Sequence, residues 1–261
     1  TYPGKLKLIL SGFHEAALSA RACFKRAKPN ETYRFEFTTA SKNIHERLGV
    51  KKWMIELFTA NTPNGIKISI MLEEIKYDYK VTLVDISKDE QFKTEFKKIS
   101  PFSKIPVIRD HKNNITIFES GAILIYLGEQ SKKFYDQDKR TIINQWLMAQ
   151  MAYVGPMLGQ HHQFHHYNPG KSQFGEERYF KVCTRIYKEL DERLADVNYL
   201  AGNFYSIADI ATFPWIARHD WHDIGLKNYK NLTRWYELIS KRDAVQKGYD
   251  LFEKKEKVPT V

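Results

Sequence analysis

The segment Thr62-Pro63-Asn64-Gly65 carries the residues of this chain that are best placed to act on a bound anion. Thr is a favoured N-cap residue and Pro a favoured first residue of a helix, and a strand-like run over 55–58 precedes them. This pattern predicts a strand-to-helix turn, where free backbone N–H groups and the positive end of the helix dipole meet. The side chains of Thr62 and Asn64 add hydrogen-bond donors but no nucleophile. A simpler interpretation is that the segment only caps a helix.

A mixed α/β domain over residues 54–132 would hold this turn. An early crossover from a strand through a helix to a second strand places the two strands in parallel. A short break later in the domain suits an antiparallel hairpin. Pro106 opens one strand there, and an Ile-Pro bond can be cis. The predicted elements are strands over 54–58, 79–85, 105–108 and 115–118, and helices over 63–75, around Phe92, Phe96 and Ile99, and over 119–127.

Residues 138–252 follow a different period. Apolar residues recur there at the spacing of an α-helix, which predicts an all-helical second domain. The first of its helices, over 142–154, should end at Gly155-Pro156. Ser206 and Asp209 predict the capped start of a later helix. Further helices are expected over 176–195 and around Trp235, Leu238 and Ile239.

Residues 1–53 differ from both domains. They hold eleven Lys or Arg and four Asp or Glu, and so carry +7 of the net charge of +10. The remaining residues form an ordinary mixed surface, so we expect no nucleic-acid partner. No hydrophobic period persists in this basic extension, and the first well-formed pattern begins at Met54. We therefore expect Met54 to be the natural start and residues 1–53 to lie outside the enzyme fold; an organelle presequence is the alternative.

The two cysteines, Cys23 and Cys183, form neither a disulfide framework nor a CxxC pair. Cys183 falls on the apolar stripe of a predicted helix, so we expect a small buried hydrophobe there and not a reactive thiol. Such cysteine usage favours a reducing compartment, and a cytoplasmic location is expected. No apolar run approaches the roughly 18 residues of a membrane span, so we expect no membrane partner.

Several separated motifs run through the two domains in order. They are Asn61-Thr62-Pro63-Asn64-Gly65, Gln91-Phe92, Ser100-Pro101, Lys104-Ile105-Pro106, Phe118-Glu119-Ser120-Gly121-Ala122-Ile123-Leu124, Gly155-Pro156-Met157-Leu158-Gly159-Gln160, Glu177-Arg178-Tyr179 and Ser206-Ile207-Ala208-Asp209-Ile210. Together they resemble the glutathione transferase superfamily and, within it, the nu-class branch. That branch contains bacterial glutathione-dependent disulfide-bond oxidoreductases and the globular domain of a yeast nitrogen-regulation prion protein. The resemblance implies a thioredoxin-like N-terminal domain followed by a helical glutathione transferase C-terminal domain.

The resemblance also implies that glutathione, reduced or oxidised, binds in the first domain as a co-substrate without a metal. Glu119 and Ser120 would hold its γ-glutamyl end, because a helix N-terminus suits the α-carboxylate and a Glu suits the ammonium. The segment Lys104-Ile105-Pro106 would pair with the cysteinyl peptide as an added strand, and Gln91 would meet the glycyl end. Arg178 would reach the glutathione of a neighbouring subunit, which implies a homodimer. Taken singly, each residue could instead be a cap or a surface residue.

The turn after the first strand has Thr59, Thr62 and Asn64 where other glutathione transferases have Tyr, Ser or Cys. In the nu-class branch the matching Thr and Asn hydrogen-bond the glutathione sulfur, so the resemblance implies catalytic roles for Thr62 and Asn64. Hydrogen-bond donors and a helix N-terminus lower the pKa of a thiol. The reactive thiol would then be glutathione's own, which would attack a disulfide sulfur.

The tract over 160–167 is rich in histidine, and His161 and His165 form one of its two i,i+4 pairs. That spacing can chelate a metal on a helix, but no glutamate at the HExxH position and no third ligand accompany it, so we expect no metal. The matching family segment lines the cleft between the domains. The resemblance therefore implies a substrate pocket formed by His161, Phe164, His165 and Tyr167.

The implied activity is that of a glutathione-dependent disulfide-bond oxidoreductase with weak transferase or peroxidase activity. One alternative is a conventional glutathione S-transferase that acts on small electrophiles. An alternative of another class is a non-catalytic regulatory module like the yeast relative. That relative carries an Asn/Gln-rich segment before its domain, whereas this chain has a Lys/Arg-rich one.

Overall fold

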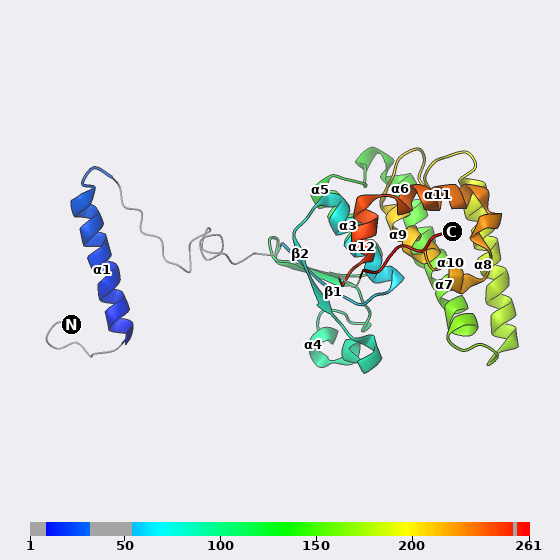
Figure 1. Cartoon of the computed structure of the whole chain (residues 1–261), viewed down its shortest axis with the longest axis horizontal. Helices are drawn as coiled ribbons and strands as arrows, with labels where there is room; N and C mark the ends of the chain where they lie inside the picture. The colour runs from blue at the N-terminus through cyan, green and yellow to red at the C-terminus, as the bar shows by residue number, and fades with distance from the viewer. Residues whose placement is uncertain (1–8, 32–53, 253–254) are drawn as a thin grey trace. The chain divides into compact units, whose positions relative to one another are not determined.

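The computed structural model describes residues 9–31, 54–252 and 255–261. The chain divides into two compact units, Thr1–Lys52 and Trp53–Val261. The first contains helix α1 (Ile9–Ala27), in which Lys25 and Arg26 complement the negative end of the helix dipole (Figure 1). The sequence pattern did not predict this helix. Residues 1–8 and 32–53 of the basic extension lie outside the described residues, so the prediction that no hydrophobic period persists there is not tested.

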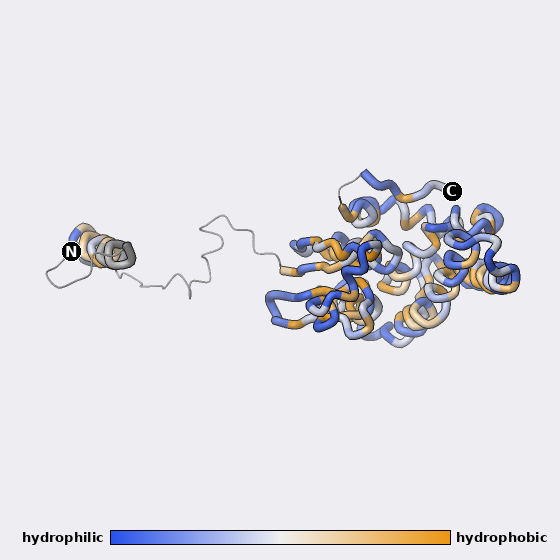
Figure 2. The backbone as a smooth tube through the Cα atoms, turned by 90° about the horizontal axis from the view of Figure 1, so that it is seen from below, coloured by the Kyte–Doolittle hydropathy of each residue, from blue (hydrophilic) through white to orange (hydrophobic). Residues whose placement is uncertain are grey.

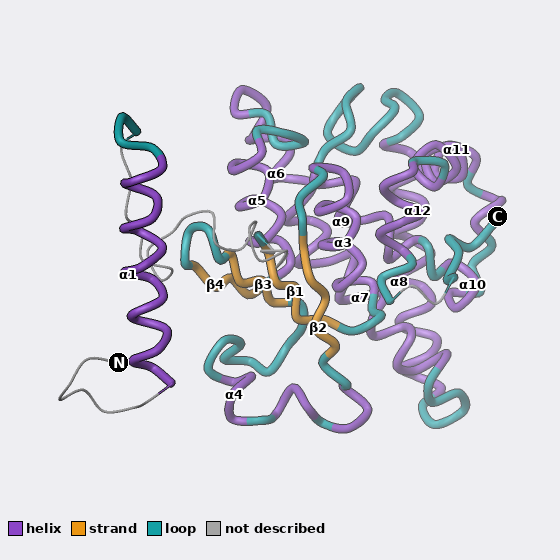
Figure 3. The backbone as a smooth tube through the Cα atoms, turned by 60° about the vertical axis from the view of Figure 1, so that its left-hand side comes forward, coloured by secondary structure: helices purple, strands orange, loops and turns teal. Residues whose placement is uncertain are grey.

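The second unit begins with a four-stranded mixed sheet in the order β2–β1–β3–β4 (Figure 3). The parallel pairing of β1 with β2 and the antiparallel pairing of β3 with β4 confirm the predicted crossover and hairpin. β3 starts two residues later than expected because Pro106 has no N–H to donate to a neighbouring strand. The Ile105–Pro106 peptide bond is cis. The strands are β1 (Ile55–Thr59), β2 (Tyr79–Leu83), β3 (Val107–Asp110) and β4 (Ile115–Phe118).

Three helices belong to this sheet domain: α3 (Pro63–Ile75), α4 (Thr94–Lys97) and α5 (Ser120–Ser131). α3 has the predicted bounds and is buried along almost its whole length, since α5 and two later helices, α9 (Ile207–Ile216) and α12 (Asp243–Tyr249), also pack against it. The helix predicted around Phe92, Phe96 and Ile99 is only the single turn of α4, preceded by 3₁₀ turns. Of those three residues only Phe96 is fully buried, which is too little apolar contact to hold a longer helix.

The rest of the unit is helical, which confirms the prediction of an all-helical second half. Hydrophobic stretches (orange) lie mainly within helices and strands, and hydrophilic stretches include the outer loops (Figure 2). No helix within the described parts of the chain has the length and apolarity needed to cross a membrane. The helical elements are α6 (Arg140–Ala149), the π-helical segments Gln150–Val154 and His162–His166 on either side of α7 (Gly155–His161), α8 (Gln173–Arg193), α9 (Ile207–Ile216), α10 (His219–His222), the 3₁₀ turn Leu226–Asn228, α11 (Lys230–Ser240) and α12 (Asp243–Tyr249).

The prediction that a helix ends at Gly155-Pro156 is wrong. α6 runs through the first π-helical segment directly into α7, and Pro156 stands in the first turn of α7. The wide turn of the π segment lets the chain continue without the hydrogen bond that Pro cannot donate. The π segment therefore changes the face of the helix on which the following residues lie, compared with a regular α-helix.

The predicted cap at Ser206 is confirmed as a complete capping box with Asp209. Asp209 is fully buried, and its carboxylate also accepts hydrogen bonds from the Leu200 N–H and from Trp235 Nε1, each at 2.9 Å. Burial raises the pKa of Asp209 to about 6 despite these donors. The carboxylate thus ties the start of α9 to a loop and to α11.

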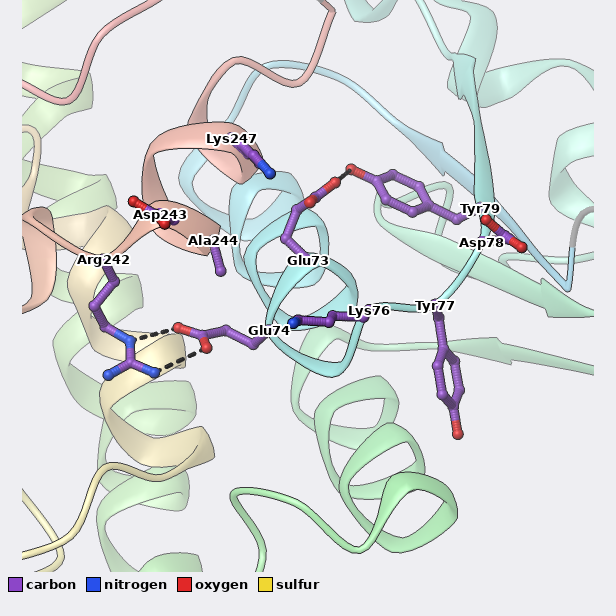
Figure 4. Close-up of a pocket in the computed structure, with 10 residues that line it drawn as sticks. All are labelled: Glu73, Glu74, Lys76, Tyr77, Asp78, Tyr79, Arg242, Asp243, Ala244 and Lys247. Atoms are coloured by element: carbon purple, nitrogen blue, oxygen red, sulfur yellow. Dashed lines mark hydrogen bonds and ion pairs between the residues drawn. The ribbon is translucent and has the colours of Figure 1, made fainter.

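Helix α12 closes the unit by packing on the back of α3. A Cβ on Gly248 would lie 2.6 Å from the backbone of Ile70, so the two helices are in direct backbone contact. Beside them a cavity of about 780 Å³ lies between the end of α3 and the start of α12 (Figure 4). There Arg242 holds the buried carboxylate of Glu74 with two hydrogen bonds of 2.6 and 2.9 Å. This bidentate pair joins the C-terminal helix to the sheet domain.

Candidate functional site

The turn between β1 and α3 has the geometry that its sequence predicts. Thr62 caps α3, and its Oγ1 accepts a hydrogen bond from the Gly65 N–H at 3.2 Å. A Cβ on Gly65 would lie 2.3 Å from Thr59 Oγ1 and 2.4 Å from the carbonyl oxygen of Ala60, so only glycine fits at this position. The Thr62 hydroxyl keeps its own proton to donate, because its oxygen is the acceptor in the cap.

Asn64 is held in one orientation by Trp215 of α9. The indole Nε1–H donates to Asn64 Oδ1 at 3.1 Å. An indole nitrogen can only donate, so the side-chain oxygen of Asn64 must face Trp215 and its NH₂ group is left for another acceptor. Asn64 lines a cavity of about 310 Å³ at the junction of the sheet domain and the helical half. The other residues that line it are Lys67, Glu119, Gln150, Met151, Gly155, Pro156, Gly159, Gln160 and Trp215.

Lys67, one turn after Asn64 on α3, is the unexpected residue of this cavity. Its side chain is 1 % exposed, and its Nζ donates to Gln150 Oε1 at 2.8 Å and to Ser120 Oγ at 3.3 Å. Burial lowers the pKa of Lys67 to about 7, and the nearby charge of Glu119 opposes this shift. Lys67 is thus a buried amine whose direct oxygen partners are both neutral.

Glu119 and Ser120 stand where β4 passes into α5. Glu119 has the left-handed φ of 70°, which is uncommon for a residue with a side chain, and it lines the same cavity as Asn64. Ser120 is buried at the first position of α5 and receives the hydrogen bond from Lys67. The structure therefore places Glu119 in the wall of the cavity and Ser120 behind that wall, in contact with Lys67.

The segment before β3 is held by Ser100. Its hydroxyl donates to the carbonyl oxygen of Lys104 at 2.7 Å and accepts from the Lys104 N–H at 3.0 Å. These bonds fix the approach to Ile105 and the buried Pro106, whereas the Lys104 side chain is exposed. Gln91 is half-buried on a 3₁₀ turn, and its Oε1 is a buried atom without a hydrogen-bond partner.

The remaining predicted residues do not line the 310 Å³ cavity. Arg178 is exposed on α8. His161 is fully buried, and its Nε2 is 2.8 Å from the carbonyl oxygen of His222. Phe164 stacks on Tyr179, and His165 stacks on His161. The structure does not bring the four predicted substrate-pocket residues, His161, Phe164, His165 and Tyr167, to the cavity; Gly155, Pro156, Gly159 and Gln160 line it from the same part of the chain.

The histidines of this tract instead belong to a buried cluster around His222 of α10. His222 Nδ1 is 2.7 Å from the Tyr187 hydroxyl, and its Nε2 is 2.7 Å from His162 Nε2. Burial lowers the pKa of His162 to about 3 and that of His222 well below its ordinary value. Both imidazoles are therefore neutral at physiological pH. Across the described ranges, no group of three or more His, Cys, Asp or Glu side chains is arranged to hold a metal ion.

The sequence reasoning missed Lys67, Gln150 and Trp215. A signal for Lys67 was present, because it is the only charged residue between Thr62 and Leu72 in a helix that is otherwise apolar on most sides. Gln150 and Trp215 gave no such signal, since a polar residue near the end of one helix and an aromatic residue on another are ordinary features. They become functional candidates only through contacts across long sequence separations.

Two protein-family models match this chain. Residues 54–129 match the family model of the glutathione S-transferase N-terminal domain, and residues 162–243 match that of the C-terminal domain. The disulfide-bond oxidoreductase YfcG of Escherichia coli (strain K12) is 42% identical over 198 residues, which cover 73% of this chain and 92% of that protein.

Two solved structures extend the comparison. A glutathione transferase from Burkholderia graminis, crystallised with two glutathione molecules per subunit, is 31% identical with a TM-score of 0.74, and the match covers 86% of this chain and 99% of that chain. A glutathione transferase from Pseudomonas putida, crystallised with one glutathione disulfide per subunit, is 36% identical with a TM-score of 0.73, over 80% of this chain and 96% of that one.

A shorter similarity involves a different kind of protein. A stretch of 52 residues, 20% of this chain, is 77% identical to the ferredoxin–NADP reductase of Pelagibacter ubique (strain HTCC1062) and covers 15% of it. The first compact unit, Thr1–Lys52, has the same length, and the N-terminal domain model begins only at residue 54.

Proposed function

The chain belongs to the glutathione transferase family, and on that premise we propose that it is a glutathione-dependent disulfide-bond oxidoreductase that uses the thiol of bound glutathione. The observation that carries this proposal is the chemistry of the catalytic turn. Thr62 and Asn64 present a hydroxyl proton and an NH₂ group at the start of α3, with neither Cys nor Tyr in the turn. Such a turn can stabilise a thiolate but cannot replace one.

Glutathione would lie along the residues predicted from the family resemblance. Its γ-glutamyl α-carboxylate would meet Ser120 and the first N–H groups of α5, and its ammonium would meet Glu119. Its cysteinyl peptide would pair with the backbone at Ile105–Pro106, with Lys104 beside it and Gln91 at the glycyl end. This orientation brings the sulfur towards the donors of Thr62 and Asn64. The buried, unpartnered Oε1 of Gln91 supports its role, because a ligand N–H would satisfy it.

The proposed reaction is thiol–disulfide exchange. The glutathione thiolate attacks one sulfur of the substrate disulfide, a new S–S bond forms, and the second substrate sulfur leaves as a thiolate that takes up a proton. A second glutathione thiolate then attacks the mixed disulfide, which releases the other substrate thiol and leaves glutathione disulfide. The substrate gains the two electrons that the two glutathione thiols lose. The similar structures with two glutathiones or with glutathione disulfide support a site of sufficient size.

The same thiolate can attack an electrophilic carbon or a hydroperoxide, so weak transferase or peroxidase activity forms part of the proposal. A small disulfide or electrophile would bind on the side of the cavity that Gly159 and Gln160 line. Behind this side, the substrate pocket would be completed by the predicted residues His161, Phe164, His165 and Tyr167. We further propose a nu-class homodimer in which Arg178 reaches the partner's glutathione, and a cytoplasmic location, which the two free cysteines support.

We also propose that residues 1–53 lie outside the enzyme fold, which then comprises a thioredoxin-like domain over 54–132 and a helical domain over 138–252. The separate compact unit and the start of the N-terminal domain match at residue 54 support this division. A protein of residues 54–261 should fold and keep its full activity. An insoluble or inactive product would contradict this division without touching the proposed chemistry.

Reduction of hydroxyethyl disulfide by glutathione tests the activity. The purified protein should catalyse this reduction, and the rate should saturate with increasing glutathione. Sedimentation velocity, which tests the proposed homodimer, should show a dimer. An Arg178→Ala variant should raise the KM for glutathione while its fold is unchanged. Absence of catalysed reduction, with rapid conjugation of a chloronitrobenzene, would favour the conventional transferase instead.

A further inference from the structure

The cavity beside the catalytic turn has a floor that the proposed chemistry does not use. Lys67 and Gln150 form this floor, and both side chains are 1 % exposed. Lys67 Nζ donates to Gln150 Oε1 at 2.8 Å, so the amide oxygen of Gln150 is already occupied. A lysine and a glutamine that are almost completely withdrawn from water need strong hydrogen-bond partners, because burial of a polar group is otherwise unfavourable.

One of these groups lacks its partner. Gln150 Nε2 is buried and has no hydrogen bond, although its oxygen is held by Lys67. A donor in this state destabilises the protein by about 1–3 kcal/mol unless an acceptor satisfies it. Gln150, Lys67 and the NH₂ group of Asn64 all face the same cavity of about 310 Å³. The cavity therefore collects donors, and the ligand chemistry that satisfies them is an anionic oxygen or sulfur.

The contact between Lys67 and Ser120 indicates which anionic group of a ligand would lie nearest to the amine. Lys67 Nζ donates to Ser120 Oγ at 3.3 Å, and the serine hydroxyl donates its own proton only to the sulfur of Met151, at 3.7 Å. A thioether is a weak acceptor, which a carboxylate oxygen would replace. Ser120 opens α5, where a carboxylate is favoured by the helix N-terminus. The positive charge of Lys67 would lie directly behind that carboxylate and strengthen the hydrogen bond that Ser120 donates to it.

We propose that Lys67 is a positioning residue that acts through Ser120 as the counter-charge of the γ-glutamyl carboxylate, and that its amine takes up a proton when glutathione binds. This inference rests on the proposed function, because it requires that glutathione is the ligand. It goes beyond the proposed function because it couples two events: the Lys67 amine becomes positively charged when the γ-glutamyl carboxylate binds.

Above pH 7 the surroundings of Lys67 favour a neutral amine. Burial lowers the pKa of Lys67 to about 7. Glu119, the N-cap of α5, is the only other charged residue that lines the cavity. The π-helical segment Gln150–Val154 and α9 contribute Gln150, Met151 and Trp215, all uncharged. An arriving carboxylate raises the pKa of the amine, because an opposite charge within a few ångströms favours the protonated form. Binding above pH 7 must then draw a proton from solution.

Titration calorimetry with S-methylglutathione tests this inference, because the thioether has no thiol proton to release. At pH 8, in buffers with different ionisation enthalpies, the wild-type full chain should take up close to one proton for each ligand bound. Its affinity should be about tenfold weaker at pH 8 than at pH 6. Both measurements use the unmodified protein, so they do not depend on whether a variant folds. Binding without proton uptake and with a flat pH profile would overturn the inference.

Lys67→Met is the matching variant, since Met replaces the amine with an apolar chain of similar length that suits a buried position. It should bind S-methylglutathione at pH 6 at least about tenfold more weakly, with no proton uptake at pH 8. Lys188→Met, at an exposed lysine of α8, is the control and should behave as wild type. Unchanged affinity and uptake in Lys67→Met would overturn the role of Lys67 alone. A wild-type protein that does not bind S-methylglutathione at all would overturn glutathione binding itself, and this inference with it.

Discussion

The indole N–H of Trp215 donates a hydrogen bond to Asn64 Oδ1 at 3.1 Å across the junction of the sheet domain and the helical half. Trp215 is itself almost fully buried and stacks against His162 of the histidine cluster. The orientation of the proposed catalytic Asn64 is thus set by a residue 151 positions later in the chain. The helical half does more than cover the sheet domain, because it decides which atom of Asn64 faces the ligand.

Trp215→Phe should reduce catalysis while keeping the aromatic packing. The substitution removes the donor, so the Asn64 carboxamide can turn its oxygen towards the glutathione sulfur. Loss of one neutral hydrogen bond corresponds to about 1 kcal/mol, or roughly fivefold in kcat/KM for disulfide reduction. Trp146→Phe is the control, since Trp146 contacts Arg193 and not the site. An unchanged kcat/KM in Trp215→Phe would show that Asn64 needs no such orientation.

Gly65→Ala should disrupt the proposed catalytic turn directly. The added Cβ would lie 2.3 Å from Thr59 Oγ1 and 2.4 Å from the Ala60 carbonyl oxygen, so the start of α3 must move. We expect a loss of about 1–3 kcal/mol in the free energy of unfolding, together with weaker glutathione binding. Urea denaturation and calorimetry measure the two effects. Gly170→Asn is the comparison, because that position has open space and a left-handed φ that Asn tolerates; similar losses in both variants would contradict the steric argument.

Cys183→Ala should leave turnover unchanged within about twofold. The Cys183 side chain is fully buried, and burial raises the pKa of its thiol to about 12, so it does not supply a thiolate near neutral pH. The free energy of unfolding should fall by about 1 kcal/mol through the lost packing. The exposed Cys23 provides the control variant, Cys23→Ala. An inactive but folded Cys183→Ala protein would mean that the reactive thiol belongs to the chain.

Stability should decline on mild acidification because of the histidine cluster. His162 and His222 have folded-state pKa values below the ordinary 6.5, so below pH 6.5 the unfolded chain binds protons that the folded chain does not. Each such group lowers the free energy of unfolding by up to about 1.4 kcal/mol per pH unit, for His162 down to about pH 3. Asp209 acts in the opposite direction, because its folded pKa of about 6 lies above its ordinary value of 3.8. The two histidines outweigh the one carboxyl group, so the free energy of unfolding should increase with pH over this range.

Urea denaturation at pH 7 and pH 5 measures this slope. His162→Gln should reduce the difference between the two pH values, since the substituted side chain does not titrate. Gln163→Asn, at an exposed residue next to His162, adds and removes no titrating group and should keep the wild-type difference. Equal stability of the wild-type protein at both pH values would contradict the assignment of neutral buried histidines.

Local signals in the sequence were sufficient for most of the sheet domain, although not for the length of α4 or the start of β3. Thr62 and Pro63 mark the start of α3, and the pattern that follows gave both of its bounds as observed. The crossover between β1 and β2 followed from chain geometry, because a strand–helix–strand connection of this length leaves few other arrangements. The capping box at Ser206 was visible for the same reason, since all its atoms lie within four residues.

The helical half and the cavity floor depended on contacts that no local pattern contains. The π segments on either side of α7 change which residues face the cavity, so Gly159 and Gln160 line it where His161 and His165 were expected. A lysine on a helix normally points to water, and Lys67 is buried only because Ser120 and Gln150 receive its amine. These features arise from tertiary packing.

The central claim is that the turn at Thr62 and Asn64 activates a thiol borrowed from glutathione. The most direct measurement is the pH titration of the thiolate ultraviolet absorbance of bound glutathione, in the wild-type protein and in a Thr62→Ala, Asn64→Ala double variant. The wild-type complex should titrate at least about one pH unit below the ordinary cysteine thiol pKa of about 8.5, and the double variant should return to that value as its disulfide reductase activity is lost. A bound thiol that titrates as in free glutathione, or a double variant with full activity, would contradict the account.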